Sequence, residues 1–212
     1  MSQPTITICT PWFNMRHLER DYFAAVRTED CEVLIIDNGS DPPLPNAWRL
    51  GWNSGFSHAS NVGLELARTD AVLFLNNDVF TPKAGWLEPI REALEPGVLV
   101  GPVIRYDAHG NVDGHSLPYV DGWCLAGMRD DLLELGGFDE GYEEPSYFSD
   151  NDLSFRARMA GMTLRPCRTP IAHLASQTSG GSSSPGVQGV LDRNQKRFSG
   201  IVRESYLQPI GA

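Results

Sequence analysis

The sequence predicts an α/β fold in which a mostly parallel sheet forms the core of one domain. Residues 32–36 and 71–75 are runs of mainly apolar residues with the length and composition of buried parallel strands. Between them, residues 58–67 place small and apolar side chains on one face at helical spacing. This alternation over the first hundred residues is typical of an open α/β domain with a nucleotide-binding topology.

The first half of the chain is expected to alternate strands with helices, separated by turn-forming residues such as Pro11 and the loop 41–45. The predicted elements are, in order, strand 5–9, helix 15–26, strand 31–36, short strand 48–52, helix 58–67, strand 71–75 and helix 85–94.

The second half is less regular, and its pattern predicts shorter elements. These are strand 98–105, a loop or hairpin at 107–114, a short helix at 131–135, a helix at 150–160 and a short strand at 171–173. Residues 178–186 are too polar and too rich in glycine to pack, so they are interpreted either as a linker or as a mobile flap over a site. A C-terminal helix is expected after them.

The amino-acid composition limits the classes of molecule that the protein is expected to bind. The 212 residues carry a net charge of −10, which disfavours nucleic acid and anionic lipid as the main partner. An acidic protein can still bind a phosphorylated ligand through a divalent cation. The four cysteines have no metal-ligand spacing, and the chain contains neither a signal-like segment nor an apolar run long enough to span a membrane. These features favour a cytoplasmic protein with reduced thiols.

Polar side chains follow two of the predicted strands. Asn76, Asn77 and Asp78 come directly after strand 71–75, and Asp37 follows strand 31–36. In open α/β sheets, ligands bind at the carboxyl ends of the strands. These residues therefore indicate a site for a cation and a sugar or nucleotide hydroxyl, although each could be an ordinary turn.

The segment 52–63 is rich in small and hydrogen-bonding residues and precedes a predicted helix. Gly55 would let a ligand approach the backbone closely, so the segment could hold a phosphate or a ribose. A tight turn between a strand and a helix explains the same composition equally well.

Six short motifs occur in a fixed order along the chain. They are Thr10-Pro11 with Asn14, Asp37-Asn38-Gly39-Ser40, Asn53-x-Gly55 with Asn61-x-Gly63, Asn76-Asn77-Asp78, Gly136-Gly137-Phe138-Asp139-Glu140, and Asp150-x-Asp152 with Arg156 and Gly161. Together they resemble the family 2 glycosyltransferases, in particular the rhamnosyltransferase-like members, over about residues 4–175. The resemblance implies a single GT-A domain, a Rossmann-like nucleotide-diphospho-sugar transferase fold over residues 1–212. Residues 1–105 would then bind the nucleotide sugar, and residues 106–175 would bind the acceptor and carry the catalysis.

The resemblance also implies a metal site. Asp78 matches the last carboxylate of the family's Asp-x-Asp motif, and His173 matches a histidine after the last strand. Both would ligate Mn²⁺ or Mg²⁺ bridging the diphosphate of the donor. Thr10, Pro11, Asp37, Asn61 and Asn77 match positions that bind the nucleotide donor; a dTDP- or UDP-linked sugar is weakly favoured.

Asp150 matches the catalytic base of the family, where an aspartate follows a glutamate; here Ser149 takes the place of that glutamate. The helix N-terminus is expected to favour the ionised form of Asp150. Ser149 and Asp152 also have the spacing of a capping box, which is a purely structural explanation for both. Trp123 is interpreted either as a platform for an acceptor sugar or as a core residue.

The predicted function is an inverting, metal-dependent transfer of a sugar from a nucleoside-diphosphate sugar to an acceptor hydroxyl, with a saccharide favoured as acceptor. The alternatives are a non-catalytic nucleotide-sugar-binding module of the same fold and a nucleotidyltransferase. A nucleotidyltransferase should carry a glycine-rich basic loop near the first strand, and residues 11–14 do not form one. The sequence leaves the oligomeric state open.

Overall fold

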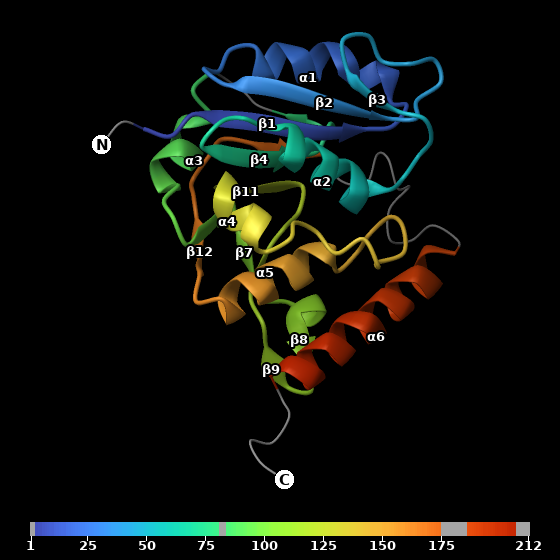
Figure 1. The fold of residues 1–212 in the computed structure, drawn as a ribbon, viewed down its shortest axis with the longest axis vertical. Coiled ribbons are helices and arrows are strands. Elements are labelled where there is room, and N and C mark those ends of the chain that lie inside the picture. The colour runs from blue at the N-terminus through green and yellow to red at the C-terminus, as the bar shows by residue number, and fades with distance from the viewer. Residues whose placement is uncertain (1–2, 81–83, 175–185, 207–212) are drawn as a thin grey trace.

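A seven-stranded sheet runs through the protein, and most of its strands are parallel, as the sequence predicts (Figure 1). The computed structural model describes residues 3–80, 84–174 and 186–206. The strand order is β12-β6-β11-β4-β1-β2-β3. The strands are β1 (Ile6–Trp12), β2 (Glu32–Asn38), β3 (Trp48–Leu50), β4 (Ala71–Leu75), β6 (Val98–Gly101), β11 (Cys124–Met128) and β12 (Thr163–Pro166).

Strand β11 is the main element that the sequence analysis missed. It lies between β4 and β6 and pairs antiparallel with both, whereas the other neighbouring pairs of this sheet are parallel. The predicted strand 98–105 is two strands, β6 and β7 (Ile104–Arg105), because Pro102 interrupts the run.

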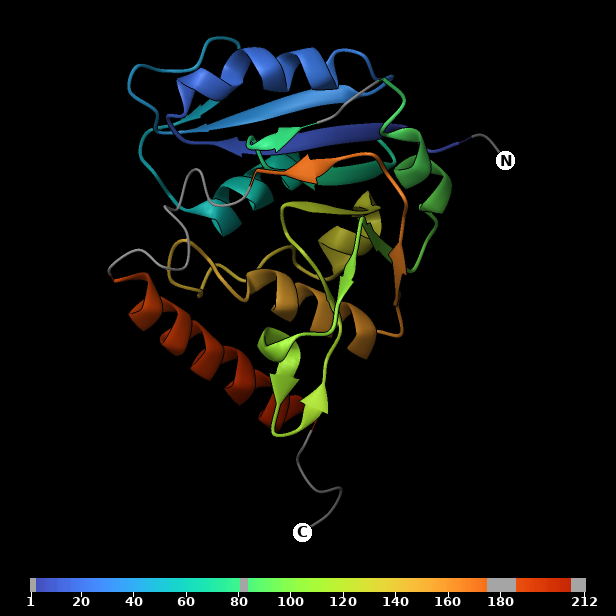
Figure 2. The ribbon, with the colours of Figure 1, turned by 180° about the vertical axis from the view of Figure 1, so that it is seen from behind.

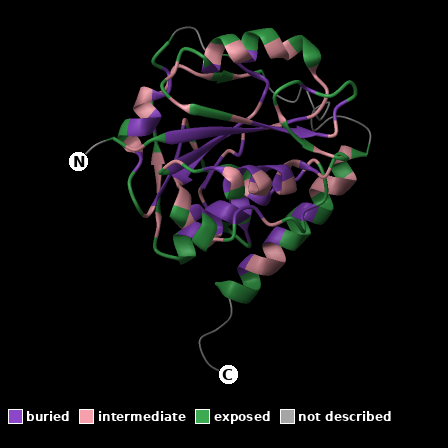
Figure 3. Ribbon diagram, turned by 45° about the horizontal axis from the view of Figure 1, so that its top comes forward, coloured by how far each residue is buried: buried purple, intermediate pink, exposed green. Residues whose placement is uncertain are grey.

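Helices cover both faces of the sheet and enclose two apolar layers. Helices α1 (Glu19–Val26) and α3 (Glu88–Ala93) pack on one face, and α1 follows the short 3-10 turn η1 (Arg16–Leu18). Helices α2 (Phe56–Leu66), α4 (Arg129–Glu134) and α5 (Ser149–Met159) pack on the other. The central strands are buried between these layers (Figure 3). The polar side chains at the carboxyl ends of these strands are therefore attached to a buried, rigid backbone.

A third, smaller apolar cluster lies on the outer side of α5. It joins α5 to α6 (Val187–Ser205) through Phe155, Phe198 and Val202. The cluster also contains residues from the hairpin of β8 (Asn111–Val112) and β9 (His115–Ser116), which follows η2 (Ala108–Gly110). Strand β7 pairs with β10 (Tyr119–Val120) in the same region.

Two short strands that are far apart in the sequence meet just after the end of β4. Strand β13 (Ala172–His173) pairs antiparallel with β5 (Val79–Phe80), and the two lie side by side in Figure 2. The four cysteines are free thiols. Among the described residues, no helix is both long and apolar enough to cross a membrane. Of the predicted flap or linker, residues 178–185 lie outside the described residues.

Candidate functional site

A cavity of about 590 Å³ lies at the carboxyl ends of β1 and β4. Its wall combines the ends of these strands with β13, the first turn of α5 and the segment that leads into β11. Segments that are far apart in the sequence therefore line the same cavity. Among the predicted site residues, those that line the cavity are Pro11, Asn77, Asp78, Trp123, Asp150 and His173.

Asp78 and His173 form a contact pair in this cavity. Asp78 Oδ1 lies 2.9 Å from His173 Nε2, although the two residues are 95 positions apart. The pairing of β5 with β13 holds them together, since Val79 lies opposite His173 and the Leu174 amide donates to the Asp78 carbonyl oxygen over 2.8 Å. The backbone thus brings a carboxylate and an imidazole to one point.

Trp123 fixes the plane of this imidazole. The two rings are stacked at a centroid distance of 5.0 Å with an interplanar angle of 3°, and the indole Nε1 donates to Asp121 Oδ2 over 3.3 Å. The sequence left a sugar platform and a core position open for Trp123. Trp123 packs against the apolar core and also lines the cavity, and His173 covers one face of its ring, which leaves the other face for any sugar that stacks on it.

The donor set of the pair suits a divalent cation. A carboxylate oxygen is a ligand for Mg²⁺ and Mn²⁺, and an imidazole nitrogen is tolerated better by Mn²⁺. No group of three or more His, Cys, Asp or Glu side chains in the described parts of the chain could hold a metal ion. Asp78 and His173 could therefore supply two ligands to a divalent cation, and the imidazole nitrogen would suit Mn²⁺ better than Mg²⁺.

Asp150 also lines the cavity, in the first turn of α5. Its Oδ2 accepts a hydrogen bond from the Gly122 amide over 2.9 Å, and its Oδ1 accepts one from the Asn151 amide over 3.0 Å. Gly122 permits this approach, because a Cβ there would meet the Asp150 Cβ at 3.3 Å. Burial raises the pKa of Asp150 to about 6, against the backbone hydrogen bonds that lower it. Burial thus acts against the ionised form that the helix N-terminus is expected to favour, and a carboxyl with this pKa is still ionised at neutral pH.

The capping box, which the spacing of Ser149 and Asp152 offered as a structural explanation for both residues, does not form. The helix begins after Phe148, and no side chain caps it. Asp152 instead pairs with Arg156 at 2.7 Å, and the Arg156 guanidinium also donates to the carbonyl oxygens of Leu135 and Gly137. Asp152 therefore stabilises the fold away from the cavity.

Asn61, predicted to bind the nucleotide, belongs to the same scaffold. Its Nδ2 donates to the Phe138 carbonyl oxygen at 2.9 Å, and its Oδ1 accepts from the Phe138 amide at 2.8 Å. Gly137 makes room for it, since a Cβ there would lie 2.3 Å from Asn61 Oδ1. Asn61 does not line the cavity, and its contacts explain it as an anchor for the turn 136–140.

Thr10 and Asp37 likewise lie behind the cavity wall. Thr10 is fully buried and hydrogen bonds to the Tyr22 hydroxyl. Asp37 is fully buried, accepts from the Leu44 amide and pairs with Arg49 at 2.7 Å. Neither lines the cavity, so their placement lends no support to a direct nucleotide contact.

The cavity wall also contains residues for which the sequence analysis had no signal. Arg105 and Tyr119, from the strand pair β7 and β10, line the cavity together with Asp121. Arg105 pairs with Asp121 at 2.7 Å. Their local sequence has neither a motif nor a clear periodicity, so only the long-range pairing of short strands brings them to the site.

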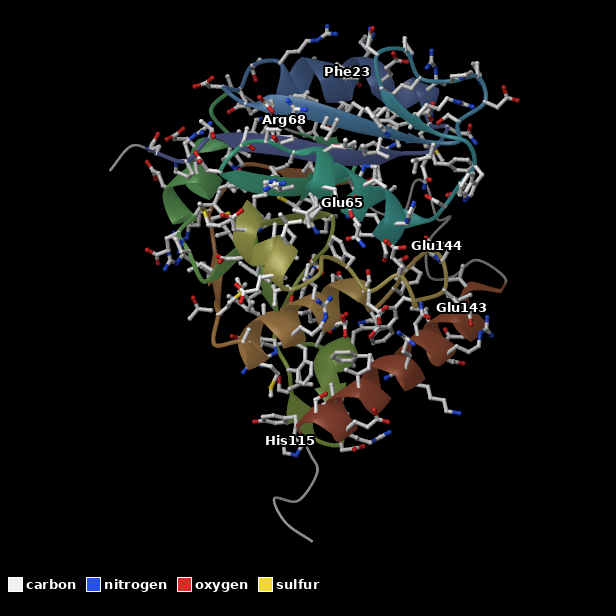
Figure 4. All side chains as sticks on the ribbon, in the orientation of Figure 1. Phe23, Glu65, Arg68, His115, Glu143 and Glu144 are labelled. Carbon is white, nitrogen blue, oxygen red and sulfur yellow. The ribbon has the colours of Figure 1, made fainter. Side chains whose placement is uncertain are left out.

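Helix α6 holds the loop before α5, of which residues 144–148 line the cavity. Asn194 is buried; its Oδ1 accepts from the Glu143 amide at 2.9 Å, and its Nδ2 donates to the Glu143 carbonyl oxygen at 2.8 Å. Arg193 pairs with the Glu143 carboxylate at 2.7 Å. Glu143 thus points to α6, whereas the neighbouring Glu144 lines the cavity (Figure 4).

The chain is similar in sequence to known glycosyltransferases. Residues 7–141 match the family model described as glycosyl transferase family 2. The chain is 30% identical over 178 residues to a pre-mycofactocin glycosyltransferase of Mycobacterium tuberculosis, with 68% of this chain covered. It spans only 37% of the length of that relative. An uncharacterized protein of the same organism is 27% identical over 183 residues, with 76% of this chain and 70% of the relative covered.

Two solved structures share the fold. One is the mannosyltransferase PcManGT from Pyrobaculum calidifontis in complex with GDP-Man and Mn²⁺, with a TM-score of 0.65 and 16% identity over 97% of this chain and 74% of that chain. The other is GalNAc-T7 with UDP, GalNAc and Mn²⁺, with a TM-score of 0.64 and 15% identity over 99% of this chain and 53% of that chain. At these identities the likeness concerns the fold.

Proposed function

Because the chain belongs to glycosyl transferase family 2, we propose that it transfers a sugar from a nucleoside-diphosphate sugar to an acceptor hydroxyl, with a divalent cation and with inversion at the anomeric carbon. The observation that carries this proposal is the meeting of the Asp78–His173 pair and Asp150 in one cavity. The family membership supplies the reaction class, and the cavity supplies a place for both substrates.

Asp78 and His173 would hold the cation and, with it, the diphosphate of the donor. When bound, a divalent cation stabilises the negative charge that develops on the departing nucleoside diphosphate. Trp123 keeps the imidazole in a fixed plane for this task. Pro11 and Asn77 line the same part of the cavity, where the nucleotide would lie.

Asp150 would act as the general base. Its carboxylate takes the proton of the acceptor hydroxyl while that oxygen attacks the anomeric carbon and the bond to the diphosphate breaks. A pKa of about 6 leaves this carboxylate ionised at neutral pH and makes it a stronger base than an ordinary aspartate. The amides of Gly122 and Asn151 hold it in place.

The proposal is tested by incubating the protein with UDP-, dTDP- and GDP-linked sugars, Mn²⁺ and a panel of glycoside acceptors. We expect release of a nucleoside diphosphate and a product whose anomeric configuration, measured by proton NMR, is inverted. Retention would contradict the single displacement with Asp150 as base. Binding of a nucleotide sugar without cleavage would favour the non-catalytic binding module.

A further inference from the structure

The first turn of α5 presents three consecutive residues to the cavity: Ser149, Asp150 and Asn151. Consecutive residues of an α-helix are about 100° apart, so three of them cover roughly 200° of the helix surface. The cavity therefore meets the end of this helix rather than one side of it. Asn151 reaches the same space as the proposed base, and neither the family motif nor the mechanism above assigns its side chain a role.

The side-chain nitrogen of Asn151 is buried and has no hydrogen-bond partner. The residue is 4% exposed, and its Nδ2 atom makes no hydrogen bond. Leaving a buried donor unpaired costs free energy, and such groups are rare in folded proteins. Among the described residues with such an unpaired atom, only Asn77 and Asn151 line the cavity, where a bound ligand could supply the missing acceptor.

Neither capping of α5 nor an ion pair explains why Asn151 is buried. Its backbone amide already donates to Asp150 Oδ1, and no side chain caps α5. One position further along, Asp152 is also buried, but it is bound to Arg156. The Asn151 side chain thus contributes no contact of this type to the helix.

On the basis of the function proposed above, we propose that Asn151 binds the acceptor: its Nδ2 donates a hydrogen bond to the oxygen next to the hydroxyl that Asp150 deprotonates. Asp150 and Asn151 both line the cavity, so one bound molecule can meet both side chains with two neighbouring oxygen atoms. The acceptor class that presents two such oxygens is a vicinal diol, as found on a saccharide.

The test replaces Asn151 by leucine, which has nearly the same shape and no polar atoms. Tyr142→Phe is the matched control, because the buried Tyr142 hydroxyl also lacks a partner but does not line the cavity. Removing an unpaired buried polar group should leave the melting temperature of both variants equal to or above that of the wild type. The probes are methyl glycosides of glucose, galactose and mannose and their mono-deoxy analogues, with the nucleotide sugar that the wild type cleaves.

We expect Asn151→Leu to lower kcat/KM for the accepted glycoside at least tenfold, mainly through the acceptor KM, while its Kd for the nucleoside diphosphate with Mn²⁺ stays within about twofold. The wild type should also prefer the parent glycoside to the analogue lacking the adjacent hydroxyl, and Asn151→Leu should lose this preference. Tyr142→Phe should behave as the wild type.

Three results would overturn the inference. Asn151→Leu could transfer at the wild-type rate, or melt several degrees lower, which would reveal a structural role. The wild type could also hydrolyse the donor but accept no vicinal diol. Failure of the proposed function is distinguishable, because the wild type would then neither bind nor cleave any nucleotide sugar.

Discussion

Replacing Asp150 by asparagine should raise stability at neutral pH while it abolishes most of the activity. Burial lifts the pKa of this carboxyl from 3.8 to about 6, and the cost falls on the ionised form. A shift of about two units corresponds to roughly 3 kcal/mol. Because the carboxyl lines an open cavity that water can enter, we expect about 1–2 kcal/mol of this to appear in the free energy of unfolding.

The pH dependence follows from linkage. Between the unfolded and folded pKa values, about pH 4 to 6, the folded protein still holds a proton that the unfolded chain has released. The folded state therefore loses stability as the pH rises through this range, and the full cost is present above pH 6. Asparagine does not ionise, so the benefit of Asp150→Asn should be absent at pH 4 and complete at pH 8.

Urea unfolding of the metal-free wild type and of Asp150→Asn at pH 4 and pH 8 measures this effect. The stability change caused by the substitution at pH 4 is subtracted from the change at pH 8. This removes the cost of altered hydrogen bonds to Gly122 and Asn151, which does not depend on pH. In parallel, sugar transfer should fall by roughly 10²–10⁴-fold, the usual contribution of a general base. A stability difference that does not change with pH, or a variant that still transfers at the wild-type rate, would refute this account of Asp150.

Three further variants distinguish residues that stabilise the fold from residues that contribute to binding in the cavity. Asp152→Asn should destabilise the protein by about 2–4 kcal/mol, measured by urea unfolding, because it leaves Arg156 partly unpaired; unchanged stability would contradict the structural role. Asn194→Leu should lower the melting temperature and raise the acceptor KM, because it frees a loop in the cavity wall, and equal loss of donor binding would argue against this division. Trp123→Leu should weaken nucleoside diphosphate binding with Mn²⁺ several-fold by loosening the ring of His173, and wild-type affinity in calorimetry would contradict it.

The sequence was most informative where local pattern and tertiary position coincide. The apolar run of β4 and its polar exit were predicted correctly, because a buried strand has a recognisable composition and a strand end in an open sheet faces a crevice. The contact of Asp78 with His173 was anticipated only through the family resemblance. No spacing rule connects residues 95 positions apart.

The sequence did not reveal which polar side chains face the cavity, because tertiary contacts decide where a side chain lies. Asn61 and Asp37 fit binding motifs, and in the fold they contact a neighbouring turn and an arginine and do not line the cavity, so their predicted contacts with the nucleotide stay predictions. Strand β11 was missed because its five residues include a glycine and give no periodic signal, although pairing with β4 and β6 makes it central. Motif matching therefore could not separate cavity residues from the residues behind them.

The account is tested most directly by calorimetric titration of UDP, dTDP and GDP into the wild type, Asp78→Asn and Asp150→Asn, with and without Mn²⁺. It predicts that one nucleoside diphosphate binds the wild type only with Mn²⁺, that Asp78→Asn loses this binding and that Asp150→Asn keeps it within about twofold. Equal binding without the metal, or wild-type affinity in Asp78→Asn, would contradict the assignment of Asp78 and His173 to the donor and of Asp150 to the acceptor.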